Sequence, residues 1–432
     1  MGEIVKLYVH PDRKEWMEIM SRSKAEESAQ VTEIVAGIIN EVKARGDEAL
    51  REYELRFDRA RLESFRVSKA EIEDAERLVP EPLKAAIAQA QKNIAAFHSA
   101  QLMQPVMVET TPGVECEQRQ VAIESVGMYV PGGNSPLFST VLMLAVPAAI
   151  AGCSRRVLCT PPGADGKVNA AILYAASLAG VEEIYKVGGA QAIAAMALGT
   201  ESIPKVSKIF GPGNRFVMEA KQQVTKFGTA IDMPAGPSEV MVIADDAANP
   251  DFVAWDFLSQ AEHGPDSQSI ALVESEAMAQ RLENAISSHI ADLPRREMML
   301  KSLSHSSIVV LDKSEIMDFA NEYAPEHLII NTADADALAS RVVNAGSVFI
   351  GAFSPESAGD YASGTNHTLP TSGFAKCYNG VNIDSYMRKI TFQRLSKEGL
   401  QALGGTIEIM AENEDLIAHK QAVTWRLNHI NE

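Results

Sequence analysis

Two side chains that can bind a metal stand three residues apart in the segment LSQAEHGPDSQ, residues 258–268. They are Gln260 and His263, and the segment is typical of the end of a helix, so both side chains would lie on one helix face. An amide oxygen and an imidazole nitrogen at this spacing can converge on one point. Acidic neighbours, Glu262 and Asp266, distinguish His263 from an ordinary buried histidine. The spacing therefore indicates part of a metal-assisted active site.

Further ligand types lie far along the chain. Asp360 stands in SPESAGDYASGTNH (354–367), and His419 stands alone near the C-terminus. With the first pair they offer one amide oxygen, one carboxylate and two imidazoles, a set that suits zinc and would also accept manganese or cobalt. The spacing of His419 alone favours an ordinary histidine over a ligand. The segment 354–367 is dense in Asp, Glu, Asn and His, which are costly to bury unless something binds there.

An acid and a histidine are adjacent at Glu326 and His327, directly after Pro325 and before an apolar run. Such a pair, where a loop meets a strand, can transfer protons. The dipeptide alone favours the alternative, a turn with two solvated side chains. The remaining histidines are interpreted as ordinary polar groups: His10, His98, His289, His305 and His429.

The elements that must position these residues follow from length and patterning. A chain of 432 residues predicts two or more domains. The first hundred residues are expected to be mostly helical, with Ile34, Ile38 and Val42 at helical spacing and a capping box at Ser68 and Glu71. Beyond them, β-branched runs alternate with Ala-rich stretches, which predicts an α/β fold with two largely parallel sheets. The expected strands are 156–159, 183–187, 207–210, 240–245, 270–274, 307–311 and 347–350, and the last fifty residues are expected to be helical.

Composition narrows the class of function. The formal net charge of -18 argues against a nucleic-acid partner. No apolar run approaches the ~20 residues that span a bilayer, and the N-terminus lacks the apolar core of a signal peptide. The four cysteines form no CxxC pair and fit a reducing cytosol; they are Cys116, Cys153, Cys159 and Cys377. A small-molecule enzyme of the cytoplasm is the expected class.

Three turns rich in glycine and proline punctuate the middle of the chain: PGGNSP (131–136), GPGN (211–214) and PAGPSE (234–239). Open α/β sheets bind ligands at the carboxyl ends of their strands, where glycines let backbone N–H groups approach a phosphate. None of the three is GxGxxG or a Walker A loop. Each alone is typical of a structural turn, but three together favour a ligand.

Long segments of the chain closely resemble the signature segments of the histidinol dehydrogenase family, in the expected order from about residue 31 to residue 427. They are PGGNSPLFSTVLMLAVPAAIAGC, VGGAQAIAAMALGTES, GPGN, IDMPAGPSEV, LSQAEHGPDSQ, PEHLI, SPESAGDYASGTNHTLPT and AHKQAVT. The resemblance implies a homodimeric enzyme of histidine biosynthesis with one zinc per subunit. It would oxidise L-histidinol through L-histidinal to L-histidine with two NAD.

The resemblance also implies roles for individual positions. The zinc ligands would be Gln260, His263, Asp360 and His419, completed across the dimer. Glu326 would activate water, and His327 would be its partner in proton transfer. Substrate contacts would come from these ligands and His327 together with Ser238, Glu356, His367 and Glu414. NAD would be held by Tyr129, Gln191 and Asn214.

The expected architecture consists of two Rossmann-like sheet domains, aldehyde-dehydrogenase-like, with helical N-terminal and C-terminal extensions. We expect an N-terminal arm (1–25), a main domain with the metal site (26–128 and 237–380) and an inserted NAD domain (129–236). A C-terminal tail (381–432) would complete the site of the partner. Where most family members have Arg-Pro, this chain has RSKAEES (22–28), which is expected to bear on oligomer packing more than on chemistry.

Three alternatives remain open. A relative of the family could oxidise another small alcohol, such as a sulfopropanediol, although Glu414 suits an ammonium substrate and would repel a sulfonate. A cysteine-dependent aldehyde dehydrogenase could use Cys116 or Cys153, but neither stands beside a histidine that would lower its pKa. A metal-binding protein without enzymatic activity is the third.

Overall fold

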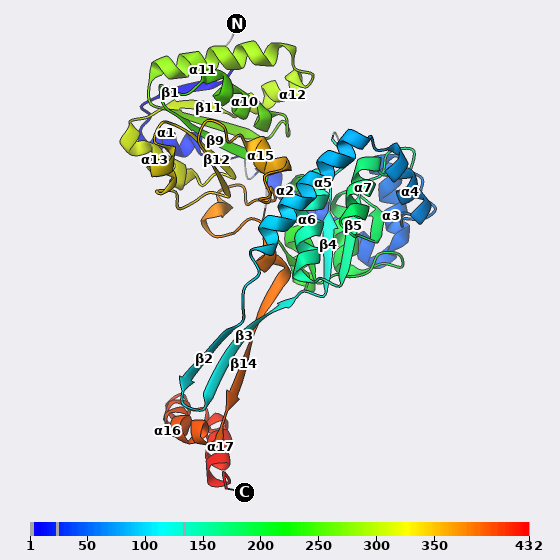
Figure 1. Cartoon of the computed structure of the whole chain (residues 1–432). Coiled ribbons are helices and arrows are strands. Elements are labelled where there is room, and N and C mark those ends of the chain that lie inside the picture. The colour runs from blue at the N-terminus through cyan, green and yellow to red at the C-terminus, as the bar shows by residue number, and fades with distance from the viewer. Residues whose placement is uncertain (1–3, 23–25, 133–134, 235, 432) are drawn as a thin grey trace.

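Three β-sheets organise the chain in the computed structural model, which describes residues 4–22, 26–132, 135–234 and 236–431. Two sheets are parallel and make up the body of the molecule, while the third is an antiparallel arm that projects from it (Figure 1). The two parallel sheets with helices on their faces confirm the α/β fold class. Among the described residues, no helix combines the length and apolar character that crossing a membrane requires.

The larger sheet has six parallel strands in the order β1-β11-β10-β9-β12-β13. Their bounds are Lys6–Val9 (β1), Ser307–Val310 (β11), Gln268–Val273 (β10), Glu239–Ala244 (β9), His327–Asn331 (β12) and Ser347–Ile350 (β13). One face is covered by α10 (Pro250–Ala261), α11 (Glu276–His289) and α12 (Arg296–Leu303). The other is covered by α1 (Arg13–Ile19), α13 (Lys313–Tyr323) and α14 (Ala335–Ala339). Helix α15 (Glu356–Tyr361) follows β13.

The smaller sheet has five parallel strands in the order β6-β5-β4-β7-β8. Their bounds are Glu183–Lys186 (β6), Arg155–Thr160 (β5), Ser125–Tyr129 (β4), Lys208–Phe210 (β7) and Ala230–Ile231 (β8). On one face pack α4 (Lys69–Leu78), α5 (Glu81–Ser99), α6 (Phe138–Ala151) and α7 (Ala170–Leu178). On the other pack α2 (Glu26–Arg45), α3 (Asp47–Tyr53), α8 (Gly189–Leu198) and α9 (Arg215–Val224). Burial on both faces explains the continuous apolar strands.

The arm consists of β2 (Val106–Thr111), β3 (Val114–Ala122) and β14 (Met387–Leu395), in the order β14-β3-β2. Helices α16 (Lys397–Asn413) and α17 (Ile417–Asn428) pack on each other at its far end (Figure 1). The expectation that the last fifty residues are helical is therefore wrong for 387–395. The strand was missed because most of its side chains are exposed, so no alternation of buried and exposed positions marks it in the sequence.

Local sequence signals gave mixed results. All seven expected strands are present, and the capping box at Ser68 and Glu71 is confirmed. The helix expected from residue 31 is α2, in which Ile38 and Val42 are buried as expected, whereas Ile34 is 44% exposed. Val31 and Val35 complete the buried face in place of Ile34.

The hydrophobic cores group the chain differently from the domain ranges expected. Among the described residues, the apolar side chains of helices α2 to α5, which span 26–99, belong to the cores of the five-stranded sheet and not to those of the six-stranded sheet. The segment 1–25 supplies β1 to the edge of the six-stranded sheet, apart from residues 1–3 and 23–25, which lie outside the described residues. Both assignments depend on contacts between distant segments, which the sequence pattern does not reveal.

Candidate active site

The predicted pair Gln260 and His263 lies where α10 ends. Gln260 is in the last turn and fully buried, and His263 follows the cap residue Glu262. The backbone N–H of His263 donates to the carbonyl oxygen of Gln260 at 3.2 Å, so the helical turn continues through both residues. Within the described residues, neither polar atom of the Gln260 side chain has a hydrogen-bond partner. A buried amide left unpaired is costly, and this fits a side chain that binds a ligand.

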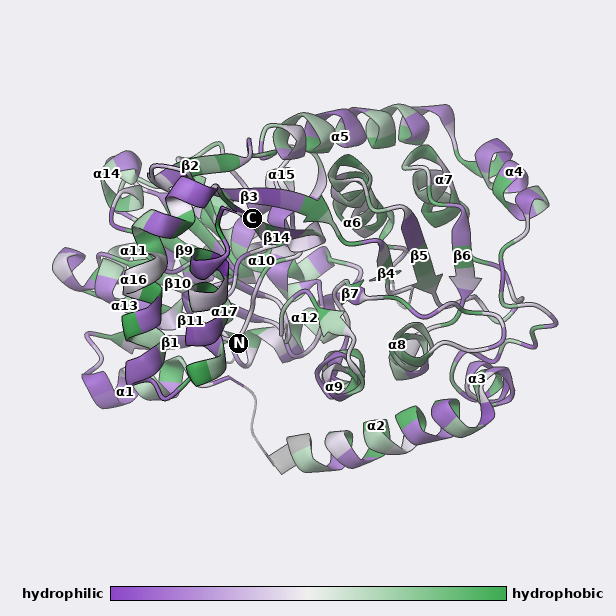
Figure 2. Cartoon of the chain, turned by 90° about the horizontal axis from the view of Figure 1, so that it is seen from below, coloured by the Kyte–Doolittle hydropathy of each residue, from purple (hydrophilic) through white to green (hydrophobic). Residues whose placement is uncertain are grey.

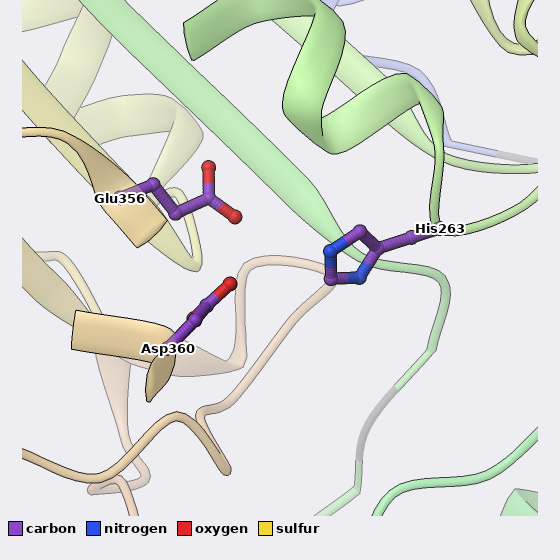
Figure 3. Close-up of side chains that lie close together, drawn as sticks. All are labelled: His263, Glu356 and Asp360. Carbon is purple, nitrogen blue, oxygen red and sulfur yellow. The ribbon is translucent and has the colours of Figure 1, made fainter. Parts of the chain in front are cut away.

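Three metal-binding side chains meet in front of this turn. The ligand atoms of His263, Glu356 and Asp360 all lie within 4.8 Å of one another. Glu356 and Asp360 are four residues apart on α15 and therefore share a face, and Figure 3 shows the three side chains gathered around a common space. An imidazole with two carboxylates is a donor set that suits zinc. The resemblance implied a substrate contact alone for Glu356, because its four-residue spacing from Asp360 becomes informative only with the helix that joins them.

His327 is the first residue of β12, at the amino end of the six-stranded sheet. Its Nε2 lies 3.6 Å from Oδ1 of Asp360, and its Nδ1 lies 3.4 Å from Oε1 of Glu356. Nδ1 is also 3.2 Å from the backbone oxygen of Glu239. Because a carbonyl oxygen only accepts hydrogen bonds, the proton is on Nδ1 and Nε2 keeps its lone pair. In the described part of the chain Nε2 is buried without a hydrogen-bond partner, as a base awaiting a proton would be.

Glu326 precedes this histidine and points to the same backbone. Its Oε2 accepts a hydrogen bond from the N–H of Glu239 at 2.9 Å and lies 3.8 Å from Nδ1 of His327. Glu326 is 5% exposed and His327 is 3% exposed. The alternative of a solvated turn is therefore wrong. Glu239, which organises both residues, was missed because the sequence marked it only as the end of a turn.

Burial controls the charges of this group. Burial is the main cause that lowers the pKa of His327 to about 3, and the charge of His263 is the second cause. Burial also raises the pKa of Asp360 to about 7, and raises the pKa values of Glu326 and Glu356 well above their usual range. A divalent cation among these groups would favour the charged carboxylates. The excess of buried acid thus fits a site for a cation.

His367 lies behind this cluster. Its Nδ1 donates to the backbone oxygen of Asp360 at 2.9 Å, and its Nε2 is 3.0 Å from Oγ1 of Thr140. Burial lowers the pKa of His367 to about 4, so the ring is neutral and Nε2 accepts from the hydroxyl. Ser238 is half-buried directly before β9, at the same edge of the sheet.

Two predicted residues are not brought to the cluster by the single chain. Glu414 caps the end of α16 and His419 is in α17, and both are exposed. These helices stand at the tip of the arm, away from α15 (Figure 1).

The residues predicted to hold NAD gather at the carboxyl edge of the five-stranded sheet. Tyr129 ends β4, and its hydroxyl accepts a hydrogen bond from the N–H of Gly189 at 3.1 Å. Gln191, in the first turn of α8, donates from Nε2 to Oε1 of Glu54 at 3.0 Å. Asn214 caps α9, and its side chain accepts from two backbone N–H groups. Glu54 is fully buried, and its position was not foreseen because its partners lie more than a hundred residues away.

A buried ion pair shapes the GPGN turn at this edge. Nζ of Lys221 lies 2.5 Å from Oδ1 of Asp232 and donates to the backbone oxygen of Gly211 at 2.8 Å. Asp232 in turn accepts from the N–H of Gly211 at 2.8 Å. Gly211 has φ +124°, and a Cβ there would collide with the backbone oxygen of Tyr129. The turn therefore requires glycine at position 211, and the ion pair forms hydrogen bonds with both the N–H and the carbonyl oxygen of that residue.

Hydrogen bonds join this edge to the cluster on the other sheet. Arg295, next to α12, donates to Oγ of Ser135 at 2.5 Å, and Thr140 of α6 contacts His367. Ser135 and Thr140, which follow β4 in the chain, thus contact side chains that lie beside the cluster. Residues 133–134 of PGGNSP and residue 235 of PAGPSE lie outside the described residues.

Comparisons with known proteins agree with the resemblance in the sequence. A family model described as histidinol dehydrogenase matches residues 21–427. A histidinol dehydrogenase from Bacteroides fragilis is 57% identical over 427 residues, covering 99% of this chain and 100% of the relative. One from Escherichia coli K12 is 53% identical over 418 residues, covering 96% of this chain and 95% of the relative.

A solved structure supports the same conclusion. The crystal structure of histidinol dehydrogenase from Elizabethkingia anophelis is 49% identical, covers 100% of both chains and superposes with a TM-score of 0.96. With a family model that matches nearly its whole length and relatives that are more than half identical to it, the chain belongs to the histidinol dehydrogenase family of oxidoreductases.

Proposed function

We propose that this protein oxidises L-histidinol through L-histidinal to L-histidine, with zinc in the site and two NAD consumed per turnover. The observation that supports this most directly is the position of His327. A neutral imidazole whose Nε2 has no hydrogen-bond partner among the described residues lies beside Asp360 and Glu356, within a group of side chains suited to a metal ion. A base and a metal site in one cluster, with Glu356 buried and His263 exposed to solvent, fit the oxidation of an alcohol that is itself a ligand for zinc.

The proposed zinc ligands are Gln260, His263 and Asp360 of one subunit and His419 of the partner subunit. Two observations support the first three: the polar atoms of the Gln260 side chain have no partner in the part of the chain that the structure describes, and His263 and Asp360 converge. When bound, zinc would orient the imidazole and amine of histidinol and NAD would accept hydride, so the metal serves mainly for positioning.

A homodimer would bring the fourth ligand into place. The tip of the arm exposes large apolar side chains, which a monomer would leave in water; they are Ile409, Met410, Leu416, Ile417 and Trp425. Figure 2 shows hydrophobic and hydrophilic residues mixed along α16 and α17. Exposed apolar surface of this kind is typical of a surface that a second subunit covers. We infer that the arm of each subunit reaches the cluster of the other and delivers His419 and Glu414.

The proton steps fall to two side chains. His327 would accept the proton of the alcohol on Nε2 in the first oxidation. Glu326 would remove a proton from the water that attacks the aldehyde in the second oxidation. Its hydrogen bond from the N–H of Glu239 holds one carboxylate oxygen, which leaves the other for water. Oε2 of Glu326 lies 3.8 Å from Nδ1 of His327, so the two proton-transfer groups are adjacent while each keeps its own hydrogen bond to the backbone of Glu239.

The remaining contacts would select and hold the substrate. Ser238, Glu356 and His367 would contact the substrate, and Glu414 of the partner subunit would add a carboxylate that suits an ammonium group. This charge favours histidinol over a sulfonated alcohol. Tyr129, Gln191 and Asn214 would position NAD at the edge of the five-stranded sheet. The cytoplasmic location expected from composition stays a prediction.

The decisive experiment counts NADH formed per histidinol consumed, with zinc and after chelation. We expect two equivalents with zinc and none after removal of the metal. One equivalent would indicate a relative that stops at the aldehyde. Turnover of a sulfopropanediol in preference to histidinol would contradict the proposed substrate.

A further inference from the structure

Arg22 forms a buried ion pair with a residue far from it in sequence. Its Nε lies 2.5 Å from Oε1 of Glu239, and its Nη2 lies 3.0 Å from Oε2, which is the two-pronged geometry that a guanidinium and a carboxylate favour. The Glu239 side chain is 3% exposed and that of Arg22 is 23% exposed. The N–H of Ser372 adds a hydrogen bond to Oε1 at 2.9 Å. The carboxylate of Glu239 is thus held in a single orientation.

The backbone of the same Glu239 holds both proposed catalytic residues. Its N–H donates to Oε2 of Glu326 at 2.9 Å, and its carbonyl oxygen accepts from Nδ1 of His327 at 3.2 Å. Glu239 is the first residue of β9, where the strand leaves the PAGPSE turn. Any shift of the Glu239 backbone would therefore displace the imidazole of His327 and the carboxylate of Glu326 together.

Arg22 also contacts Tyr323, which lies in the segment that leads into Glu326. Its Nη2 donates to the backbone oxygen of Tyr323 at 2.9 Å, and the guanidinium lies 3.9 Å from the centre of the Tyr323 ring. Tyr323 is followed by Ala324, whose φ of +54° is unusual for a residue with a side chain. This turn leads through Pro325 into Glu326. Arg22 thus links the two segments that position Glu326.

We propose that Arg22 is a positioning residue for the Glu326–His327 pair, acting through the Glu239 backbone and the turn after Tyr323. The inference rests on the roles proposed above for Glu326 and His327. It differs from the expectation that the segment 22–28 bears mainly on oligomer packing. Because the proposed metal ligands Gln260, His263 and Asp360 are on other elements, loss of Arg22 should spare zinc and substrate binding while it misplaces the proton-transfer groups.

The test compares Arg22→Met and Arg22→Lys with Arg13→Met. Arg13 is a matched control, since it also pairs with a glutamate, Glu322 at 3.1 Å, and lies 3.9 Å from an aromatic ring, but its ion pair is exposed. We expect Arg22→Met to lower kcat for histidinal by roughly 10²-fold, as misplacement of a catalytic group by about 1 Å can do. KM for histidinol and zinc content should stay near the wild-type values. Arg22→Lys should recover part of kcat, and Arg13→Met should leave it unchanged.

Chemical rescue separates positioning from a loss of folded protein. Guanidinium at low, non-denaturing concentration should restore part of the histidinal activity of Arg22→Ala but not of a Glu326→Gln variant. Wild-type kcat in folded Arg22→Met would overturn the inference. It would also be overturned if KM for histidinol rose and zinc content fell by as large a factor as kcat fell.

A crystal structure keeps this test independent of the proposed reaction. If the wild-type protein failed to oxidise histidinol, the proposed function would be wrong whatever the variants did. The positioning role would then be judged by the 2.9 Å contact between the Glu239 N–H and Glu326. We expect that contact to be lost in Arg22→Met, and its retention would refute the role of Arg22.

Discussion

Nε2 of His327 lies 3.6 Å from Oδ1 of Asp360, while the other nitrogen of the ring is held by the backbone of Glu239. One side of the imidazole is thus committed to structure, and the other faces the side chains proposed to surround zinc. This orientation makes His327 a base towards the substrate rather than a passive member of the core. It depends on a hydrogen bond between two strands, β9 and β12, that pair in parallel.

The change Glu326→Gln should separate the two oxidations. Glutamine keeps the size and can accept the Glu239 hydrogen bond, but it cannot remove a proton from water. We expect oxidation of histidinol to the aldehyde to persist and oxidation of histidinal to fall by ~10²–10⁴-fold, the usual contribution of an acid–base group. Single-turnover NADH formation from each substrate measures both steps. Unchanged turnover of histidinal would show that another group activates water.

A mixture of two inactive variants should recover activity if the site is shared between subunits. In a mixed dimer of His263→Ala and His419→Ala, one site receives both substitutions and the other receives neither. Random exchange of subunits should then restore about one quarter of wild-type activity, as two-fold symmetry requires. The control pairs His263→Ala with Asp360→Ala, which affect the same part of the site and should restore nothing. Equal recovery in both mixtures would contradict the proposed delivery of His419.

Replacing cysteines should leave the aldehyde step intact. Cys116 lies on β3 in the arm, and burial raises the pKa of Cys153 to about 11, so neither thiol is poised to attack a carbonyl. We expect the variant Cys116→Ala/Cys153→Ala to oxidise histidinal within a few-fold of the wild-type rate, while chelation abolishes that activity. Complete loss in the folded variant, without loss of zinc, would favour the thiol mechanism.

The stability of the protein should fall as pH rises through the titration of Glu54. Burial raises the pKa of Glu54 from 4.5 to about 8, with the charge of Asp58 contributing less. Between these values the folded state keeps a proton that the unfolded state has lost, so the cost of burying this acid is absent below pH 4.5 and grows towards pH 8. Glu54→Gln removes that cost. Relative to wild type, the variant should therefore be more stable at pH 8 than at pH 5.

Denaturant unfolding at the two pH values measures this difference. Glu63→Gln serves as the control, because it removes the same charge from an exposed position. A stability difference for Glu54→Gln that is the same at both pH values would show that Glu54 does not retain its proton in the fold. The same measurement with NAD present would also report whether Glu54 supports Gln191 at the proposed cofactor site.

Local patterns in the sequence predicted much of the framework. Strands buried on both faces are marked by runs such as 240–245, and a capping box marks the start of α4 at Ser68. The spacing of Gln260 and His263 likewise reflects one helical turn. These features were predictable because each depends on residues within a few positions of one another. The strand 387–395 has no buried face and left no such mark.

The amino-acid sequence by itself therefore determined the fold class, the residue types of the site and the family to which the chain belongs. Only the tertiary structure decided which of these residues meet. Arg22 and Glu239 are separated by 217 positions, and Gln191 and Glu54 by 137, yet each pair forms one buried contact. Such pairing follows from the order of strands in a parallel sheet and from helices packed across it. Those long-range contacts leave no periodicity along the chain that a reader of the sequence could detect.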